Sequence, residues 1–158
     1  MLKLAKVRPY QQETQRSCSA ACLRAVLLHH GTDIPEAVLS KAIGVAHYGA
    51  ELYQIVGVAR ALGFKAKQVE FKSMEDAFKL LRKDLPIICD VQSWTKKGSG
   101  HYVVLVNESG GRVNIMDPNV QGNWRTMPGE DFDKRWWDGD NVYRGRMLRR
   151  PAVTIEPR

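Results

Sequence analysis

Cys18 is the side chain in this sequence best placed to act as a nucleophile, because it stands at the expected start of a helix. The stretch QRSCSAACLRAVLLHHG (residues 15–31) is apolar on nearly every side and predicts a helix over 18–30 that Gly31 ends. The unpaired N–H groups and positive dipole end of a helix stabilise a thiolate. We expect Ser17 to cap the helix and Cys18 to lie on its first turn. By spacing alone, Cys18 could equally be a small core residue.

A thiolate nucleophile needs a base that can also protonate the leaving group, and the sequence offers four histidines for that role. His29 and His30 end the same helix, a whole helix length from Cys18, and His47 falls in an expected loop. His101 opens an expected strand after the flexible stretch TKKGSG (95–100). A strand packed on the helix start would hold an imidazole rigidly, although a lone histidine at a strand start is more often structural.

An acidic residue is expected beside His101. The turn SGG (109–111) predicts a hairpin, which brings residues 101 and 117–119 to the same end. In that register the carboxylate of Asp117 can accept a hydrogen bond from the imidazole and fix its tautomer. The alternative is that the pair Asp117–Pro118 is only a turn signal.

Glutamines precede the helix and could supply an oxyanion donor. A side-chain amide beside the thiol would complete an oxyanion hole with the backbone N–H of Cys18. Gln11, Gln12 and Gln15 are all near enough in sequence, and composition does not choose among them.

The elements that must position these residues change type along the chain. Helical spacing and caps predict helices over 18–30, 33–44, 50–64 and 73–83, with a strand over 65–71. Later stretches are rich in β-branched residues and predict strands over 85–92, 101–109 and 111–118, with another near 142–155. Helices first and antiparallel strands later are typical of an α+β fold. The 158 residues suit a single domain spanning 1–158.

Composition and cysteine usage exclude several protein classes. No apolar run reaches the ~20 residues that span a bilayer, and the N-terminus lacks a signal-peptide core. We therefore expect a cytoplasmic protein without membrane insertion. Three cysteines are an odd number, which without an export signal argues against a disulfide framework, and no second Cys or His pair at finger spacing completes a zinc site. Cys22 should be buried one turn deeper than Cys18, and Cys89 should be inert core in a strand.

The net charge of +7 is concentrated near the C-terminus, where residues 142–158 hold five arginines against Glu156. A basic end can bind nucleic acid or an anionic membrane. The chain shows no interleaving of aromatic and basic residues, so we expect no nucleic-acid partner and favour a solvated edge strand.

Together these pieces resemble a known family. Gln12, SCSAACLRAVLLHHG (17–31), GHYVVLV (100–106) and VNIMDP (113–118) resemble the C39 peptidase domain, a papain-like cysteine protease domain usually found at the N-terminus of bacteriocin-exporting ABC transporters. GAELYQIVGVARALGFKA (49–66) and PGEDFDKRWWDGD (128–140) are similar to the family's second helical segment and closing segment.

The resemblance implies a papain-like fold, with the nucleophile at a helix N-terminus packed on a C-terminal antiparallel sheet. It implies that Cys18 is the nucleophile, His101 the general base and acid, Asp117 the orienting carboxylate and Gln12 the oxyanion donor. No cofactor or metal is implied. The family usually has an acidic residue before the cysteine and a glycine after it, whereas this chain has Ser17 and Ser19.

Members of the family cut leader peptides after a double glycine, so the resemblance implies a peptide or protein substrate with small residues at the cleavage site. The chain ends at Arg158, so we expect a free-standing domain, which either acts with a separate ABC exporter or cuts a different kind of substrate. Two alternatives remain at this point. The same residues could run acyl transfer, or the domain could bind peptides as an adaptor with little cleavage.

Overall fold

Helices dominate the first half of the chain and strands the second half. The computed structural model describes residues 7–14, 16–46, 49–95, 99–120, 122–139 and 145–158. The helices are α1 (Cys18–His29), α2 (Glu36–Ile43), α3 (Leu52–Ala61), α4 (Met74–Leu81) and α5 (Gly129–Arg135). The strands are β1 (Lys65–Glu70), β2 (Ile87–Gln92), β3 (Gly100–Ser109), β4 (Arg112–Met116), β5 (Trp124–Pro128), β6 (Trp137–Gly139), β7 (Met147–Arg149) and β8 (Pro151–Glu156).

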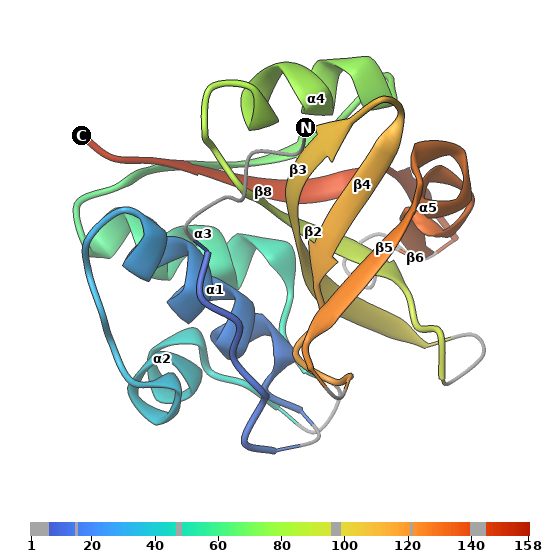
Figure 1. Ribbon diagram of the computed structural model, residues 1–158. Coiled ribbons are helices and arrows are strands. Elements are labelled where there is room, and N and C mark those ends of the chain that lie inside the picture. Colours follow the sequence, from blue (N-terminus) through green and yellow to red (C-terminus); the bar gives the residue numbers. More distant parts are fainter. Residues whose placement is uncertain (1–6, 15, 47–48, 96–98, 121, 140–144) are drawn as a thin grey trace.

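A six-stranded antiparallel sheet forms the centre of the structure, in the order β1-β8-β2-β3-β4-β5. Helices α1 and α3 cover one face, with α2 packed on them, and α4 and α5 cover the other (Figure 1). Both faces are therefore buried, and side chains alternate between two apolar clusters. Along β3, Tyr102, Val104 and Val106 join the cluster under α1, whereas Val103 and Leu105 join the cluster under α4.

The α+β fold is as expected from the sequence, and most element boundaries agree to within a few residues. Helix α1 begins at Cys18, and the chain leaves it through Gly31 at φ +97°. Glycines 110 and 111 make the turn between β3 and β4 with positive φ. The sequence patterns did not reveal β5, α5 or β6, which are short and partly exposed. None of the helices in the described part of the chain has the length and apolar character that crossing a membrane requires.

The C-terminal strand corrects one expectation. We expected a solvated edge strand, but β8 lies between β1 and β2 and is buried through Ile155. Two of the arginines before it pair within the fold: Arg146 binds Glu70, and Arg150 binds Asp133 with its Nε 2.7 Å from Oδ1. The edge-strand interpretation was therefore wrong.

The start of α1 is fixed by a carboxylate from α2. Ser17 occupies the N-cap position but makes no capping bond, contrary to our expectation. Its Oγ instead donates to Glu36 Oε2 at 2.8 Å, and the same oxygen accepts from the backbone N–H of Glu13, also at 2.8 Å. Glu36 is only 3% exposed. The segment that enters α1 is thus tied to α2 before the helix begins.

Replacing Glu36 tests this tie. Glu36→Ala leaves two donors without their acceptor and should lower the free energy of unfolding by about 1–3 kcal/mol. Glu36→Gln should lose much less, because both bonds end on one oxygen that an amide carbonyl can replace. Urea unfolding followed by circular dichroism measures the difference. The control is Glu75→Ala, at an exposed ion pair with Arg82, and an equal loss in that variant would contradict the prediction.

Candidate active site

Cys18 is the first residue of α1 and is half-buried against the sheet. Strand β3 packs across α1, so the start of the helix faces the end of the strand that carries His101. Cys22, one turn deeper, and Cys89, in β2, are fully buried, and burial raises the pKa of both thiols well above the usual value. Cys18 is therefore the accessible thiol of the described chain.

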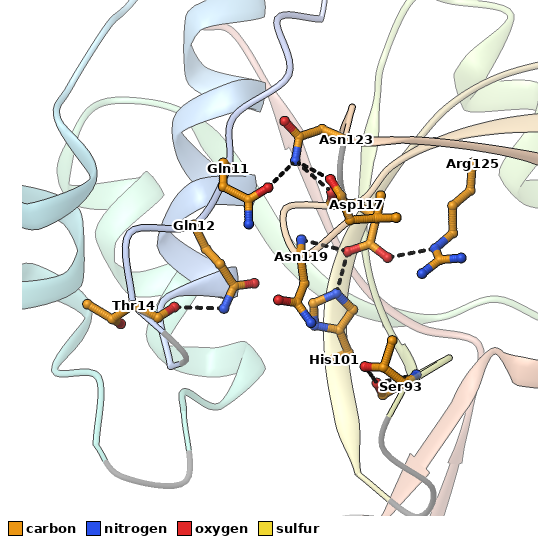
Figure 2. Close-up of polar contacts among 11 residues, drawn as sticks. Gln11, Gln12, Thr14, Ser93, His101, Asp117, Asn119, Asn123 and Arg125 are labelled. Atoms are coloured by element: carbon orange, nitrogen blue, oxygen red, sulfur yellow. Dashed lines mark hydrogen bonds and ion pairs between the residues drawn. The ribbon is translucent and has the colours of Figure 1, made fainter.

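His101 contacts both Cys18 and Asp117. Its Nε2 lies 2.6 Å from Asp117 Oδ1 (Figure 2), and the interaction of its side chain with Cys18 raises its pKa. Because Nε2 donates to Asp117, Nδ1 is the ring nitrogen left for the thiol. The two side chains are nearly buried, with His101 8% and Asp117 1% exposed. The hairpin of β3 and β4 brings them together, as the expected register requires.

The neighbours of His101 favour its protonated form. Burial alone lowers the pKa of an imidazole, but here the hydrogen bonds and charges of Asp117 and Cys18 outweigh burial and raise the pKa of His101 from 6.5 to about 9. An imidazolium is the form that can stabilise a thiolate and later give a proton to a leaving amine.

Asp117 is held at both oxygens. Oδ1 accepts from His101 and, at 2.9 Å, from the backbone N–H of Asn119, while Oδ2 accepts from Arg125 Nε at 2.8 Å (Figure 2). Burial raises the pKa of a carboxyl group, but the bonds from His101, Arg125 and Asn119 outweigh it and lower the pKa of Asp117 to about 2. Asp117 is thus a fixed carboxylate.

Sequence reasoning did not identify Arg125. It reaches Asp117 because β5 pairs with β4, with Arg125 opposite Ile115, two residues before the carboxylate on the same face. The signal that could have found it is the second hairpin, whose turn uses Gly122 at φ +81° and Asn123 at φ +60°. Asn123 Nδ2 donates to the carbonyl oxygens of Asp117 and Val120, which closes that turn.

Gln12 is attached through its backbone to the segment that follows Asp117. Its backbone N–H donates to Pro118 O at 2.9 Å, which ties it to the segment after Asp117. Its Nε2 donates to Thr14 O at 2.7 Å, and its Oε1 is buried with no partner among the described residues. Figure 2 shows the side chain on the side of Asn119 and His101.

The other two glutamines differ from Gln12. Gln11 Oε1 accepts from Asn123 Nδ2 at 2.8 Å, so its side chain holds the loop to the second hairpin turn. Gln15 lies outside the described residues, as do His47 and residues 96–98 of the stretch TKKGSG.

The remaining described histidines are not near the thiol. His29 Nε2 contacts Asp84 O at 3.1 Å and His30 Nε2 contacts Ile155 O at 3.2 Å, both at the far end of α1. Among the described residues, no three His, Cys, Asp or Glu side chains gather in a way that could hold a metal ion.

Asp90, in β2, is a further acidic group near Cys18. It is 6% exposed, and burial, followed by the charge of Asp138 and a hydrogen bond to it, raises its pKa well above the usual value. Sequence reasoning missed Asp90, since an acidic residue in an apolar strand carries no signal of what lies across from it.

Comparison with known proteins assigns the family. The model of the peptidase C39 family matches residues 6–139. The chain therefore belongs to that family, and it is a cysteine peptidase with the papain-like fold of C39 domains.

Individual relatives agree with this assignment. The chain is 30% identical over 127 residues to the lactococcin-G-processing and transport ATP-binding protein LagD of Lactococcus lactis subsp. lactis; the match covers 80% of this chain and 17% of that protein. The chain thus spans under a fifth of the length of this relative.

Two solved structures share the fold. The peptidase domain of Streptococcus ComA, a bifunctional ABC transporter involved in quorum sensing, superposes with a TM-score of 0.78 at 22% identity, covering 96% of this chain and 99% of that one. A double glycine motif protease from an AMS/PCAT transporter, in complex with the leader peptide, superposes with a TM-score of 0.72 at 23% identity. The match covers 98% of this chain and 94% of that one.

One NMR experiment can show that the pKa values of His101 and His30 are shifted in opposite directions. In protein labelled with ¹³C-histidine, His101 should titrate near pH 9, and His30 below its usual 6.5 because burial lowers its pKa. Asp117→Asn should move His101 back toward 6.5 and leave His30 unchanged. Since folding raises the pKa of His101, the stability this proton adds is complete below about pH 6.5 and is lost as the pH rises through about 9. A wild-type His101 that titrates at or below 6.5 would contradict the assignment.

Proposed function

We propose that this protein hydrolyses peptide bonds through an acyl-enzyme, with Cys18 as nucleophile, His101 as general base and acid, Asp117 as the orienting carboxylate and Gln12 as an oxyanion donor. The observation that carries the proposal is the position of His101, which interacts with a thiol at a helix start and hydrogen-bonds a buried carboxylate. That arrangement activates a nucleophile and supplies a proton for the leaving group.

The reaction proceeds in two steps. The thiolate of Cys18 attacks the scissile carbonyl, and the carbonyl oxygen becomes an oxyanion held by Gln12 Nε2–H and the backbone N–H of Cys18. The C–N bond then breaks as the His101 imidazolium gives its proton to the leaving amine. Water attacks the thioester, passes a proton to His101, and releases the acid product and the Cys18 thiolate, which restores the thiolate–imidazolium pair.

Gln12 is suited to the oxyanion role by its anchoring. Nε2 carries two hydrogens, and the one directed to Thr14 O fixes the amide while the other can serve an acyl oxygen. The backbone bond to Pro118 O sets the distance between the amide and the segment of Asp117. Both ends of Gln12 are therefore held before substrate binds.

The proposed substrate is the leader of a precursor peptide, cut after a double glycine, with an ABC exporter as partner. Support comes from the lactococcin-processing transporter that the chain resembles and from the double glycine protease solved with its leader peptide. We further propose that residues 1–158 act as one peptidase unit on the cytoplasmic side, where a reducing environment keeps Cys18, Cys22 and Cys89 as free thiols.

A synthetic precursor tests the proposed substrate. A peptide with Gly-Gly before the scissile bond should be cut there by the wild-type protein, and mass spectrometry of the products should locate the cut. Replacing Gly-Gly by Val-Val should abolish cleavage, and Cys18→Ala should cut neither peptide. Cleavage of the Gly-Gly peptide by Cys18→Ala, or equal cleavage of both peptides by wild type, would contradict the proposal.

Thiol labelling tests the nucleophile without a substrate. At neutral pH, iodoacetamide should label Cys18 first, because Cys22 and Cys89 are buried thiols with raised pKa values. Cys18→Ala should lose fast labelling, whereas Cys22→Ala and Cys89→Ala should keep it. Peptide mass spectrometry identifies the labelled residue, and preferential labelling of Cys22 would defeat the assignment.

The oxyanion donor is tested by a pair of neighbouring glutamines. Gln12→Ala should reduce kcat on the order of 10²–10³-fold, the usual loss for one oxyanion donor. Gln11→Ala is the matched control, since its amide is engaged with Asn123, and it should change kcat far less. A larger loss in Gln11→Ala than in Gln12→Ala would reverse the assignment of the two side chains.

A further inference from the structure

We propose that Arg125 is a positioning residue of this site: held against the ring of Trp94, it fixes the Asp117 carboxylate in the orientation that His101 requires. The inference rests on the proposed function, because it assigns a task to Arg125 in the same reaction.

The first argument is the burial of Asp117. With 1% of the residue exposed, water does not satisfy its oxygens, so each oxygen depends on a protein donor. Oδ1 has His101 and the N–H of Asn119, and Oδ2 has Arg125 Nε at 2.8 Å. Without Arg125 the carboxylate could rotate about its Cβ–Cγ bond, and Oδ1 would no longer be fixed opposite the imidazole.

The second argument is that Arg125 is itself held in place. Strand pairing puts it opposite Ile115, and its guanidinium carbon lies 4.6 Å from the centre of the Trp94 ring. The same ring carries Arg135 at 5.2 Å, and Arg135 Nη1 donates to Ser93 O at 3.2 Å. Trp94 thus supports the guanidinium from the connection that follows β2, while β5 supports its backbone.

The third argument is charge. The ion-pair form of the site alternates in sign, from the Cys18 thiolate to His101, Asp117 and Arg125. A second cation on Asp117 balances the buried carboxylate when His101 loses its proton during the reaction. No other Lys, Arg or His of the described chain forms an ion pair with Asp117.

The pH at which Cys18 becomes reactive reports on this positioning. The titratable groups near Cys18 are His101 from β3, Asp90 from β2, Tyr102 from β3 and Cys22 from α1. All four remain in the variants below. If Asp117 loses its orientation, His101 stabilises the thiolate less well, and removal of a nearby cation acts in the same direction.

The experiment measures the rate of Cys18 alkylation by iodoacetamide from pH 4 to 10, with each cysteine quantified by mass spectrometry. For Arg125→Met, the rise in rate should move to higher pH by about half to one unit, and kcat on a cleavable peptide should fall about 10- to 100-fold with KM nearly unchanged. Arg125→Lys keeps the positive charge but lacks the planar guanidinium. Its shift in the alkylation profile and its loss of kcat should both be smaller than those of Arg125→Met.

Two further variants separate positioning from general stability. Trp94→Ala should shift the alkylation profile in the same direction by a smaller amount, and Trp94→Phe should restore it. The matched control is Arg24→Met, because Arg24 also binds a carboxylate, Asp33, and stacks on an aromatic ring, Tyr10. It should leave the alkylation profile in place.

An unchanged profile in Arg125→Met overturns the proposal, and so does an equal shift in Arg24→Met. If Arg125→Met does not fold, Trp94→Ala decides: a shifted profile supports the proposal and an unchanged one overturns it. If wild-type Cys18 reacts only at the pH of an ordinary thiol, the proposed function fails, and the assignment of Arg125 falls with it.

Discussion

The buried carboxylate of Asp117 is the constraint on which the rest of this structure depends. A charge with 1% exposure is tolerated only if donors surround it. Here the donors come from three places in the chain: His101 on β3, the N–H of Asn119 in the turn after β4, and Arg125 on β5. Two successive hairpins are needed to bring those groups to one point, so the site requires the order β3-β4-β5 at this end of the sheet.

The same segment also connects the helical half of the molecule to the sheet. Gln12 N–H binds Pro118 O, and Gln11 Oε1 accepts from Asn123, so the chain just before α1 is attached to the turn just after Asp117. From the other side, Glu36 holds that chain to α2. The position of the thiol relative to the imidazole is therefore set by bonds on both sides of the helix start, and not by α1 packing alone.

Local patterns in the sequence were enough to predict helix α1 and the contact between His101 and Asp117. Apolar residues and Gly31 located α1, and counting back from the turn at 109–111 put His101 beside Asp117. What failed depended on contacts distant in sequence. Strand β8 was expected at an edge, because nothing in residues 151–156 says that they insert between β1 and β2. Arg125 was missed because β5 is five residues long and alternates weakly.

The departure from the family at Ser17 also has a structural explanation of this kind. The family usually has an acidic residue before the cysteine. This chain has Ser17 there, so that position supplies no carboxylate to the helix start. Ser17 nevertheless donates to Glu36 Oε2, so a buried carboxyl group still lies one hydrogen bond from that position, supplied by α2. Because Glu36 is nineteen residues away in sequence, local pattern favoured an N-cap for Ser17, whereas its hydroxyl is used to join two helices. A carboxyl group therefore lies beside the helix start in this protein, supplied by α2 and not by the residue before Cys18.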